Sequence, residues 1–301
     1  MTTGHTSPTQ VKSRIATGMG KARIFSEALP FIKRYRDTTV VIKYGGSAMV
    51  DAALRESFAD DVAMLHYVGI NPVIVHGGGP HISRALKQRG IESTFVDGLR
   101  VTDDDTISVV QATLIGEVNP DIVRLINTHG SLATGVNGLD ANLFLAEQID
   151  PALGHVGRVV HVNTTLIKGL QSQGFVPVVA PLARGPKGET LNVNADTAAA
   201  ALAIALGATK LVYLTDVEGL YEDLGREDSL ISRITVESLE EMLGSTSITA
   251  GMLPKLQSCV DALKGSVEMA HILDGRVQHA VLLEVFTPEG IGTMITKGSN
   301  A

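Results

Sequence analysis

The sequence predicts an α/β fold built on a mostly parallel sheet with helices on both faces. Two observations lead to this prediction: short apolar, β-branched runs alternate with segments of helical periodicity, and two of the runs end in glycine clusters. Strands buried on both faces are continuous apolar runs, because helices cover both sides of a parallel sheet. Ligands bind such sheets at the carboxyl ends of the strands, and we therefore expect a site beside the glycine clusters.

The predicted strands and helices follow one another along the chain from residue 39 onward. Five apolar runs rich in β-branched residues are predicted to be strands; these are residues 39–46, 71–79, 175–182, 210–217 and 279–286. Seven segments with helical spacing lie between them; these are residues 52–68, 80–89, 103–127, 164–173, 196–206, 236–243 and 255–264.

A separate helical arm is predicted before the first strand. Apolar residues recur there at steps of three and four, which places them on one helical face; they are Ile15, Met19, Ala22, Phe25, Leu29 and Ile32. We expect Pro30 to kink or end this helix, because proline lacks the N–H that an interior helical bond requires.

Composition and length indicate a two-lobed protein without nucleic-acid or membrane partners. The polar turn at residues 183–190 is the predicted boundary, which gives an arm at 1–36, an N-terminal lobe at 37–183 and a C-terminal lobe at 184–301. The net charge of −7 argues against nucleic acid, and no apolar stretch is long enough to span a bilayer. The single cysteine, Cys259, and a polar N-terminus without a signal-peptide core favour a cytoplasmic protein.

The stretch VIVHGGGPHIS, residues 73–83, ends a predicted strand in three glycines and a proline. It does not match the dinucleotide motif G-x-G-x-x-G, because Ile82 stands where the last glycine would be. Neither G-K-[ST] nor G-x-S-x-G occurs in the chain. Pro80 suits the first turn of a helix, where backbone N–H groups favour an anion. The cluster is therefore either an anion-binding loop or a tight turn that needs glycine.

A second glycine pair, Gly45-Gly46, follows another predicted strand, and Lys43 lies just before it. A lysine is rarely buried in an apolar strand without a partner. It either reaches solvent from an edge strand or contributes positive charge to a site. Two glycine-rich strand ends with one such lysine suggest that a phosphate chain lies across the edge of the sheet.

Six motifs together resemble the amino-acid kinase superfamily, and within it the N-acetyl-L-glutamate kinases. In order they are VVIKYGGSA, VIVHGGGPHI, GLRVT, LNVNADTAA, YLTDVEGLY and ITAGMLPKL, and the resemblance extends from about Arg36 over nearly the whole chain. It implies a three-layer α/β/α sandwich whose N-terminal lobe binds the acidic substrate and dimerises, while the C-terminal lobe binds ATP. The implied reaction is phosphorylation of the side-chain carboxylate of N-acetyl-L-glutamate to the 5-phosphate in arginine biosynthesis. Mg²⁺ would be held mainly by the nucleotide phosphates, without a protein metal site.

The resemblance implies three catalytic residues, Lys43, Lys255 and Asp196, in which both lysines stabilise the transition state and Asp196 pairs with them. Transfer of a phosphoryl group to a carboxylate, which is already ionised at neutral pH, needs positive charge rather than a general base. Lys255 follows Pro254 in the first turn of a predicted helix, where a cation opposes the helix dipole. The alternatives are a solvated lysine at Lys255 and a helix-capping role for Asp196.

The resemblance also implies the substrate and nucleotide contacts. The residues expected to bind the substrate are Gly78, Gly79, Arg100 and Asn192. Those expected to bind the nucleotide and its phosphates are Gly45, Gly46, Thr215, Asp216 and Tyr221. Arg100 can hold an α-carboxylate through two N–H groups, or it can pair with Asp103, Asp104 or Asp105 instead. The nine histidines show no metal-ligand spacing, and His76 is interpreted as a packed structural residue.

Two further segments resemble arginine-inhibited members of the family. His271, Glu284 and Gly290 stand at positions that match their effector site, and a carboxylate such as Glu284 can accept a guanidinium. Those members use an N-terminal arm to join dimers into a hexamer; the alternative is that the arm packs on its own lobe. The resemblance therefore implies inhibition by L-arginine and a homo-oligomer with a dimeric core.

Two other functions remain compatible with the sequence. The chain could phosphorylate another acidic amino acid, such as glutamate, aspartate or a carrier-linked aminoadipate, or it could be a non-catalytic amino-acid sensor. GLRVT and LNVNAD favour the acetylated substrate, and the presence of Lys43, Lys255 and Asp196 argues against a sensor.

Overall fold

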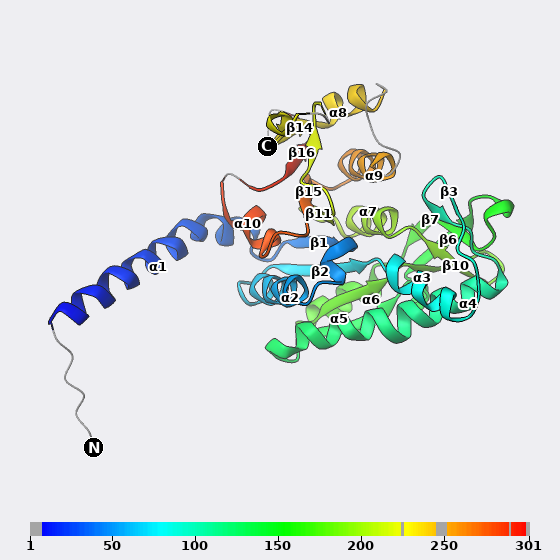
Figure 1. The fold of residues 1–301 in the computed structure, drawn as a ribbon, viewed down its shortest axis with the longest axis horizontal. Coiled ribbons are helices and arrows are strands. Elements are labelled where there is room, and N and C mark those ends of the chain that lie inside the picture. The colour runs from blue at the N-terminus through cyan, green and yellow to red at the C-terminus, as the bar shows by residue number, and fades with distance from the viewer. Residues whose placement is uncertain (1–7, 224–225, 245–251, 289, 299–301) are drawn as a thin grey trace, which may run out of the picture.

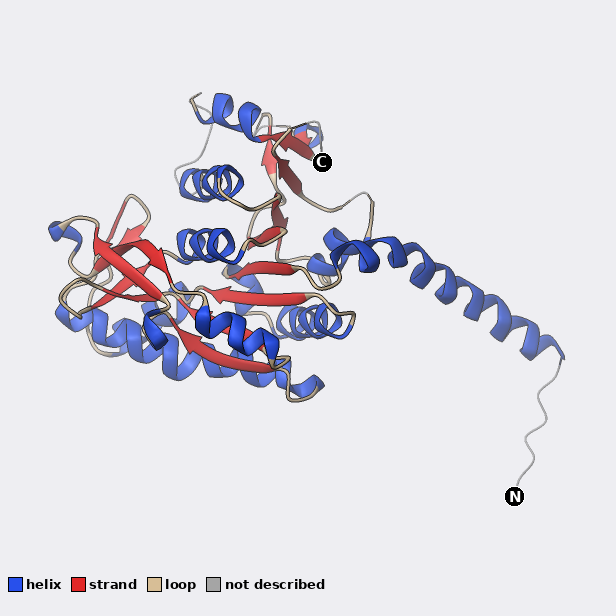
Figure 2. Ribbon diagram, turned by 180° about the vertical axis from the view of Figure 1, so that it is seen from behind, coloured by secondary structure: helices blue, strands red, loops and turns tan. Residues whose placement is uncertain are grey.

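An eight-stranded sheet forms the centre of the molecule, and helices cover both of its faces (Figures 1 and 2). The computed structural model describes residues 8–223, 226–244, 252–288 and 290–298. Across the sheet the strands follow the order β14, β16, β15, β11, β1, β2, β8 and β5. Every neighbouring pair is parallel except β15 and β16. The prediction of a mostly parallel α/β sheet is therefore confirmed.

The bounds of the main elements are as follows. The strands of the large sheet are β1 Thr39–Tyr44, β2 Asn71–His76, β5 Ala133–Asn137, β8 Val176–Ala180, β11 Lys210–Thr215, β14 Arg233–Thr235, β15 Met269–Asp274 and β16 Thr293–Thr296. The helices are α1 Pro8–Tyr35, α2 Ala52–Tyr67, α3 Gly79–Gln88, α4 Asp104–Thr113, α5 Asn119–Ile126, α6 Thr165–Ser172, α7 Ala195–Leu206, α8 Val236–Leu243, α9 Leu253–Lys264 and α10 Ala280–Phe286.

Each central strand divides its side chains between two hydrophobic cores. On one face, Val41 of β1 and Leu211 of β11 pack together with the apolar residues of α7 and α9. On the other face, Val40 and Ile42 of β1 pack with residues of α2, α5 and α10. This alternation follows from the two-residue repeat of a strand. It builds the three layers of an α/β/α sandwich, as predicted.

A second, smaller sheet closes into a barrel beside the large one. Its strands are β6 Phe144–Gln148, β7 Val156–Val162, β9 Leu182–Arg184 and β10 Thr190–Val193. The polar turn at which we expect the lobe boundary connects β9 to β10 as an antiparallel hairpin. Two short hairpins complete the described strands: β3 Phe95–Val96 with β4 Leu99–Arg100, and β12 Leu220–Tyr221 with β13 Leu230–Ile231.

One predicted strand is wrong. In the run at 279–286, residues 280–286 form helix α10, not a strand. The buried positions Ala280, Val281, Glu284 and Val285 recur with helical rather than strand spacing. The apolar run HAVLLEVF is too short to distinguish a buried strand from a buried helix by itself, and its packing against α2 and β15 selects the helix.

Four strands of the large sheet, β5, β14, β15 and β16, were not predicted. The strand β15, MAHILD, contains a histidine and an aspartate, and both are buried in the fold. The predicted helix at 103–127 begins at Asp104 and carries a π-helical turn, Leu114–Val118, between α4 and α5. That turn adds a local widening of the helix without breaking it.

Helix α1 projects from the body as a long arm (Figure 1). Pro30 lies inside it, so the expectation that the helix ends there is wrong. Phe31 and Tyr35 beyond the proline pack on the body and hold the last turn. In the stretch that the structure describes, Met19 and Leu29 are more than 60% exposed, so this part of the arm does not dock on its own lobe. The side chain of Ile15 lies outside the described residues. Over the described residues, neither α1 nor any other helix combines the length and apolarity that crossing a membrane requires.

Candidate active site

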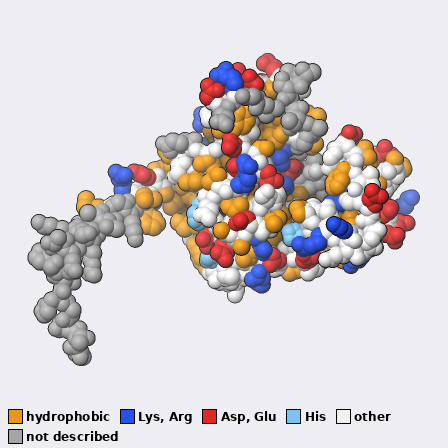
Figure 3. Space-filling model, viewed as in Figure 1, with side chains coloured by type: hydrophobic (Ala, Val, Ile, Leu, Met, Phe, Trp, Pro, Cys, Tyr) orange, Lys and Arg blue, Asp and Glu red, His pale blue; other side chains and the backbone are white. Residues whose placement is uncertain are grey.

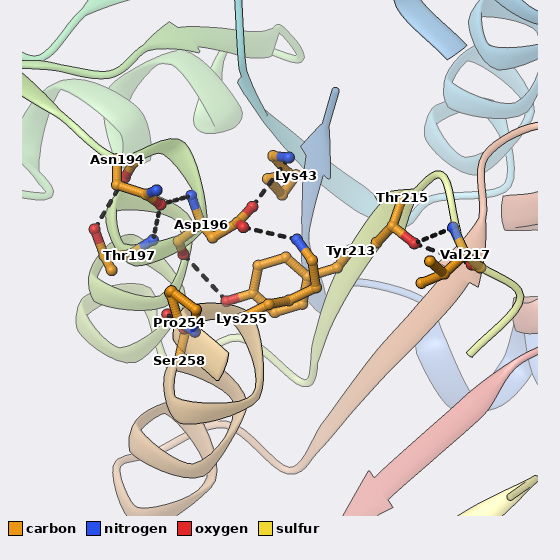
Figure 4. Close-up of polar contacts among 10 residues, drawn as sticks. All are labelled: Lys43, Asn194, Asp196, Thr197, Tyr213, Thr215, Val217, Pro254, Lys255 and Ser258. Atoms are coloured by element: carbon orange, nitrogen blue, oxygen red, sulfur yellow. Dashed lines mark hydrogen bonds and ion pairs between the residues drawn. The ribbon is translucent and has the colours of Figure 1, made fainter. Parts of the chain in front are cut away.

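Lys43, Asp196 and Lys255 come together at the carboxyl edge of the central sheet (Figure 4). Lys43 lies near the end of β1, Asp196 in the first turn of α7 and Lys255 in the first turn of α9. The Lys255 Nζ donates to Asp196 Oδ2 at 2.6 Å, and the Lys43 Nζ lies 3.0 Å from Oδ1. One carboxylate thus pairs with two ammonium groups that come from different elements.

The charges in this cluster do not cancel. The three side chains are nearly buried, with 13%, 14% and 8% of Lys43, Asp196 and Lys255 exposed. Burial alone would raise the pKa of Asp196, but the two ammonium groups outweigh it and lower that pKa to about 2. Two cations with one anion leave one positive charge, which can attract an anionic ligand.

Lys255 is the more buried of the two lysines, with 8% of its side chain exposed against 13% for Lys43. Burial lowers the pKa of Lys255, and the nearby Lys43 ammonium lowers it further, while Asp196 opposes both effects. Helix α9 begins at Leu253, so Lys255 also faces the unfavourable end of the helix dipole. Lys255 is therefore buried and not solvated, which excludes the alternative of a surface lysine.

Asn194, which we did not predict, caps helix α7. Its Oδ1 accepts hydrogen bonds from the backbone N–H groups of Asp196 at 2.8 Å and Thr197 at 3.2 Å. Asp196 is therefore not the cap, and its carboxylate is available to the lysines. The preference of asparagine for the position before an alanine-rich helix is the signal that could have identified it.

Two glycines allow the loop after β1 to lie close to charged side chains. Gly46 has a φ of +69°, and a Cβ there would lie 2.6 Å from the Asp216 carboxylate. A Cβ on Gly45 would lie 2.7 Å from the Lys43 Nζ. Asp216 accepts a hydrogen bond from the Ser47 N–H at 2.7 Å. Asp216, at the end of β11, therefore holds this loop against the neighbouring strand.

The second glycine cluster joins β2 to α3. Gly78 precedes α3, and a Cβ there would lie 2.5 Å from a methyl group of Leu114. A Cβ on Gly79 would meet no atom within 4 Å. The helix therefore begins within the cluster, with Pro80 in its first turn as expected. The N–H groups at a helix start can bind an anion.

Arg100 lies beside the second glycine cluster and is buried. Its guanidinium donates to the Gly79 carbonyl at 3.2 Å, to Ser83 Oγ at 3.0 Å and to Ser93 Oγ. The ring of Phe95 stacks 4.5 Å from the guanidinium carbon. The alternative of a salt bridge to an acidic neighbour is not observed: Asp103 caps α4, and Asp104 pairs with His155.

Asn192 is connected to Arg100 through Thr102. The Asn192 side-chain amide donates to Thr102 Oγ1 at 3.3 Å, and Thr102 Oγ1 donates to the Arg100 carbonyl at 2.8 Å. Strand β10 and the residues after β4 are thereby brought together.

Thr215 ends β11, and Tyr221 lies in β12 beyond the loop that contains Asp216. The Thr215 hydroxyl donates to the Val217 carbonyl at 3.0 Å, and the Tyr221 hydroxyl donates to Glu218. Their expected role in nucleotide binding stays a prediction.

His76 is packed inside the protein, as predicted. Its Nδ1 donates to the Gly77 carbonyl at 2.7 Å, and its Nε2 accepts from the Asn119 amide at 3.1 Å. Burial lowers the pKa of His76 to about 4, so the ring is neutral at pH 7.

The three residues expected to bind an effector line one pocket of about 130 Å³ at the base of the arm, together with Tyr35 and Lys210. The Lys210 Nζ donates to His271 Nε2 at 3.0 Å, and His271 Nδ1 donates to Glu284 Oε1 at 2.6 Å. Gly290 has a φ of +62°, and a Cβ there would lie 2.8 Å from Glu284. Burial raises the pKa of Glu284, but the His271 hydrogen bond and other contacts outweigh it and lower that pKa. The pocket therefore contains a carboxylate that is ionised at neutral pH.

The family comparison agrees with this arrangement. The model of the amino acid kinase family matches residues 38–274. This chain belongs to the amino acid kinase family. It is 50% identical over 288 residues to the acetylglutamate kinase of Caldanaerobacter subterraneus subsp. tengcongensis, with 95% of this chain and 96% of that protein aligned. It is 52% identical over 285 residues to the acetylglutamate kinase of Frankia casuarinae, with 92% of this chain and 78% of that protein aligned. Within the family, the chain groups with the acetylglutamate kinases.

A solved structure extends the likeness of this amino acid kinase to N-acetylglutamate synthase from Neisseria gonorrhoeae. The synthase complexed with coenzyme A and N-acetyl-glutamate matches with a TM-score of 0.81 and 27% identity, over 92% of this chain and 64% of the synthase chain. The synthase complexed with coenzyme A and L-arginine matches with a TM-score of 0.77 and 27% identity, over 92% of this chain and 66% of the synthase. This chain therefore spans less than two thirds of the synthase.

Metal ligands do not gather in the part of this amino acid kinase that the structure describes. No three His, Cys, Asp or Glu side chains lie there as a group that could hold an ion. Asp196, the acidic residue at the centre of the cluster, is already paired with two lysines.

The cap of α7 leads to a prediction about stability. We expect Asn194→Ala to lower the free energy of unfolding of this amino acid kinase by about 1 kcal/mol, because two N–H groups of the first turn lose their acceptor. Asn194→Ser keeps a capping oxygen and should lose less. Urea denaturation followed by circular dichroism measures both differences, and equal stability of the wild type and Asn194→Ala would contradict the capping role.

Proposed function

We propose that this chain transfers the γ-phosphoryl group of ATP to the side-chain carboxylate of N-acetyl-L-glutamate, as a step of arginine biosynthesis. The observation that carries the proposal is the cluster of Lys43, Asp196 and Lys255 beside two glycine-rich strand ends. The acetylglutamate kinase relatives, 50% and 52% identical, support the choice of reaction.

The proposed chemistry joins two anions. A carboxylate oxygen of the substrate attacks the γ-phosphorus, the bond to the β–γ bridging oxygen breaks, and ADP leaves with that electron pair. The products are ADP and N-acetyl-L-glutamyl 5-phosphate, and no proton needs to be removed from the nucleophile. The two lysines neutralise the charge that spreads over the phosphoryl oxygens, and the N–H groups of Gly45, Gly46, Gly78 and Gly79 are placed to bind phosphate oxygens. Asp196 holds both lysines in position.

Mg²⁺ would enter this site with the nucleotide. We expect the ion to be held mainly by phosphate oxygens and water. When bound, the ion neutralises phosphate charge.

Substrate and nucleotide would occupy opposite lobes. Arg100 of the lobe at 37–183 and Asn192 of β10, which is linked to it through Thr102, are suited to an α-carboxylate and a neutral acetamide. Asp216, Thr215 and Tyr221 would contact the nucleotide in the lobe at 184–301. A free α-ammonium would meet the wrong charge beside Arg100, which favours the acetylated amino acid over free glutamate. The single cysteine, Cys259, favours a reducing compartment and with it a cytoplasmic location.

Hydroxylamine trapping of the acyl phosphate tests the reaction. The assay compares N-acetyl-L-glutamate with glutamate, aspartate and aminoadipate, each with ATP and Mg²⁺. Hydroxamate should form fastest with N-acetyl-L-glutamate. Faster formation with another acidic amino acid would assign a different kinase activity, and no hydroxamate with any of them would favour a sensor.

Inhibition by L-arginine is the second part of the proposal. The pocket at the base of the arm holds the Glu284 carboxylate, and a carboxylate can accept two N–H groups of a guanidinium. The similar synthase was solved with L-arginine, which supports this ligand. An effector between α1 and α10 could change how far the lobes close, and closure brings Lys43 and Lys255 to the phosphoryl group.

For this pocket we expect Glu284→Gln to raise the arginine concentration for half-inhibition about 10-fold or more, because a charge-assisted pair is lost. The kcat without arginine should stay within about 2-fold of the wild type, because Glu284 is not among the residues that contact the phosphoryl group. Glu268→Gln, an exposed neighbour, is the control. Full activity of the wild-type protein in millimolar arginine would contradict the effector site and leave the kinase proposal intact.

The arm is proposed to join dimers into a hexamer. Apolar side chains are visible on the part of α1 that is not grey (Figure 3). Among its residues Met19, Ile24, Phe25 and Leu29 are exposed. An exposed apolar stripe is stabilised when two copies bury it against each other. Light scattering should show a hexamer for the full chain and a dimer after deletion of residues 1–34. A full chain that is dimeric would contradict this role.

A further inference from the structure

Tyr213 is a fully buried residue of β11 with a polar hydroxyl in an otherwise apolar core. It stands directly opposite Lys43 in the pairing of β1 with β11. Paired residues of neighbouring parallel strands point to the same face, so both side chains face α7 and α9. A buried tyrosine hydroxyl usually makes a hydrogen bond. The group that it binds indicates the structural role of the residue.

The hydroxyl of Tyr213 donates to the backbone carbonyl of Asp196 at 3.1 Å (Figure 4). That carbonyl lies in the first turn of α7, where the helix itself also supplies a donor to it. The bond is therefore not needed to satisfy the carbonyl. Its effect is to hold the first turn of α7, and with it Asp196, at a defined position relative to β11.

The ring of Tyr213 supports the ammonium group of Lys255. The Lys255 Nζ lies 5.1 Å from the ring centroid, within the range of a cation–π contact. Only 8% of the Lys255 side chain is exposed. Among the described residues, its one hydrogen-bond acceptor is Asp196. The ring face thus offsets part of the desolvation of a buried cation.

A single side chain therefore contacts both members of the Asp196–Lys255 pair and lies across the strand from Lys43. We propose that Tyr213 is a positioning residue for the phosphoryl-transfer site, in which the hydroxyl places Asp196 and the ring orients Lys255. This inference rests on the proposed kinase function. Tyr213 itself need not touch the substrate or ATP.

The two contacts can be removed separately. Tyr213→Phe removes the hydroxyl and keeps the ring, whereas Tyr213→Leu removes both and remains apolar. Phe144→Leu is the matched control, because Phe144 is also a fully buried aromatic residue of the same core. The three variants are compared with the wild type for thermal unfolding, kcat and the KM values of N-acetyl-L-glutamate and ATP.

We expect kcat to fall about 5-fold in Tyr213→Phe, in line with one lost hydrogen bond. In Tyr213→Leu it should fall about 30-fold or more, since the cation–π contact is lost as well. Both KM values should change by less than about 3-fold, because misplaced lysines weaken the transition state more than the bound ground state. Phe144→Leu should lose stability and keep kcat within about 2-fold.

The pH dependence of kcat distinguishes loss of the cation–π contact from loss of core packing. The groups that face the Lys255 ammonium are Asp196 from α7, Lys43 from β1, Tyr213 from β11 and Cys259 from its own helix. The ring favours the charged ammonium, so its removal should lower the pKa of Lys255. The alkaline limb of kcat should therefore move to lower pH in Tyr213→Leu and stay in place in Phe144→Leu.

The outcomes separate the two proposals. A wild-type protein that does not phosphorylate N-acetyl-L-glutamate contradicts the proposed function. If the wild type is active, a folded Tyr213→Leu variant with normal kcat overturns the positioning role, and so does an equal loss of kcat in Phe144→Leu. If Tyr213→Leu does not fold, the kcat of Tyr213→Phe is the test. An unchanged kcat in Tyr213→Phe overturns the role of the hydroxyl and with it the proposal.

Discussion

Replacement of Lys255 by alanine is expected to lower kcat by about 10³-fold while the protein stays folded. The Lys255 ammonium is nearly buried and bound to Asp196, so it supplies a pre-positioned positive charge at low dielectric. Such a charge stabilises the transition state more than the ground state, because phosphoryl charge spreads as the bond to ADP breaks. The loss should therefore appear mainly in kcat.

Initial rates of ADP formation at saturating substrate measure this effect. Lys43→Ala should behave similarly, because Lys43 pairs with the other oxygen of the same carboxylate. Lys264→Ala is the matched control: Lys264 lies on the same helix, but its ion pair with Glu240 is solvent-exposed. A folded Lys255→Ala protein with more than a tenth of the wild-type kcat would exclude the proposed role.

Asp196→Asn is expected to lower both kcat and the free energy of unfolding. The amide keeps the shape of the carboxylate but leaves two buried ammonium groups without a counter-charge. Breaking a buried ion pair in this way costs about 3 kcal/mol, and kcat should fall at least about 100-fold as the lysines move or lose their protons. Asp261→Asn, an exposed carboxylate on α9, should change neither quantity strongly.

The difference in the free energy of unfolding between the wild type and Asp196→Asn should shrink as the pH falls. The folded-state pKa of Asp196 is lowered to about 2, below the ordinary value of about 3.9 for an unfolded chain. Its contribution is therefore fully present above about pH 4 and is lost as the pH falls toward 2. Urea denaturation should show the gap between wild type and Asp196→Asn shrinking over that interval. A gap that is constant from pH 7 to pH 2.5 would mean that the carboxylate charge does not stabilise the fold.

Local patterns in the sequence were sufficient to predict the architecture and the edge at which the site lies. The runs at 39–46, 71–79 and 210–217 are apolar on both faces, and only a sheet covered by helices on both sides buries such runs. The glycines after the first two runs mark strand ends where bare backbone approaches other groups. These properties depend on residues that are neighbours in the chain, so they are visible without a structure.

The tertiary structure decided those features that depend on contacts between segments distant in the chain. The run at 279–286 has no distinctive period, and its packing against α2 and β15 made it helix α10. Asp196 could have capped α7, but Asn194 takes the cap and leaves the carboxylate to Lys43 and Lys255. Tyr213 was one apolar residue of a predicted strand until the register of β1 with β11 placed it beside this cluster. In each case the free energy depends on contacts between residues dozens of positions apart, and only the folded chain brings those residues within reach of one another.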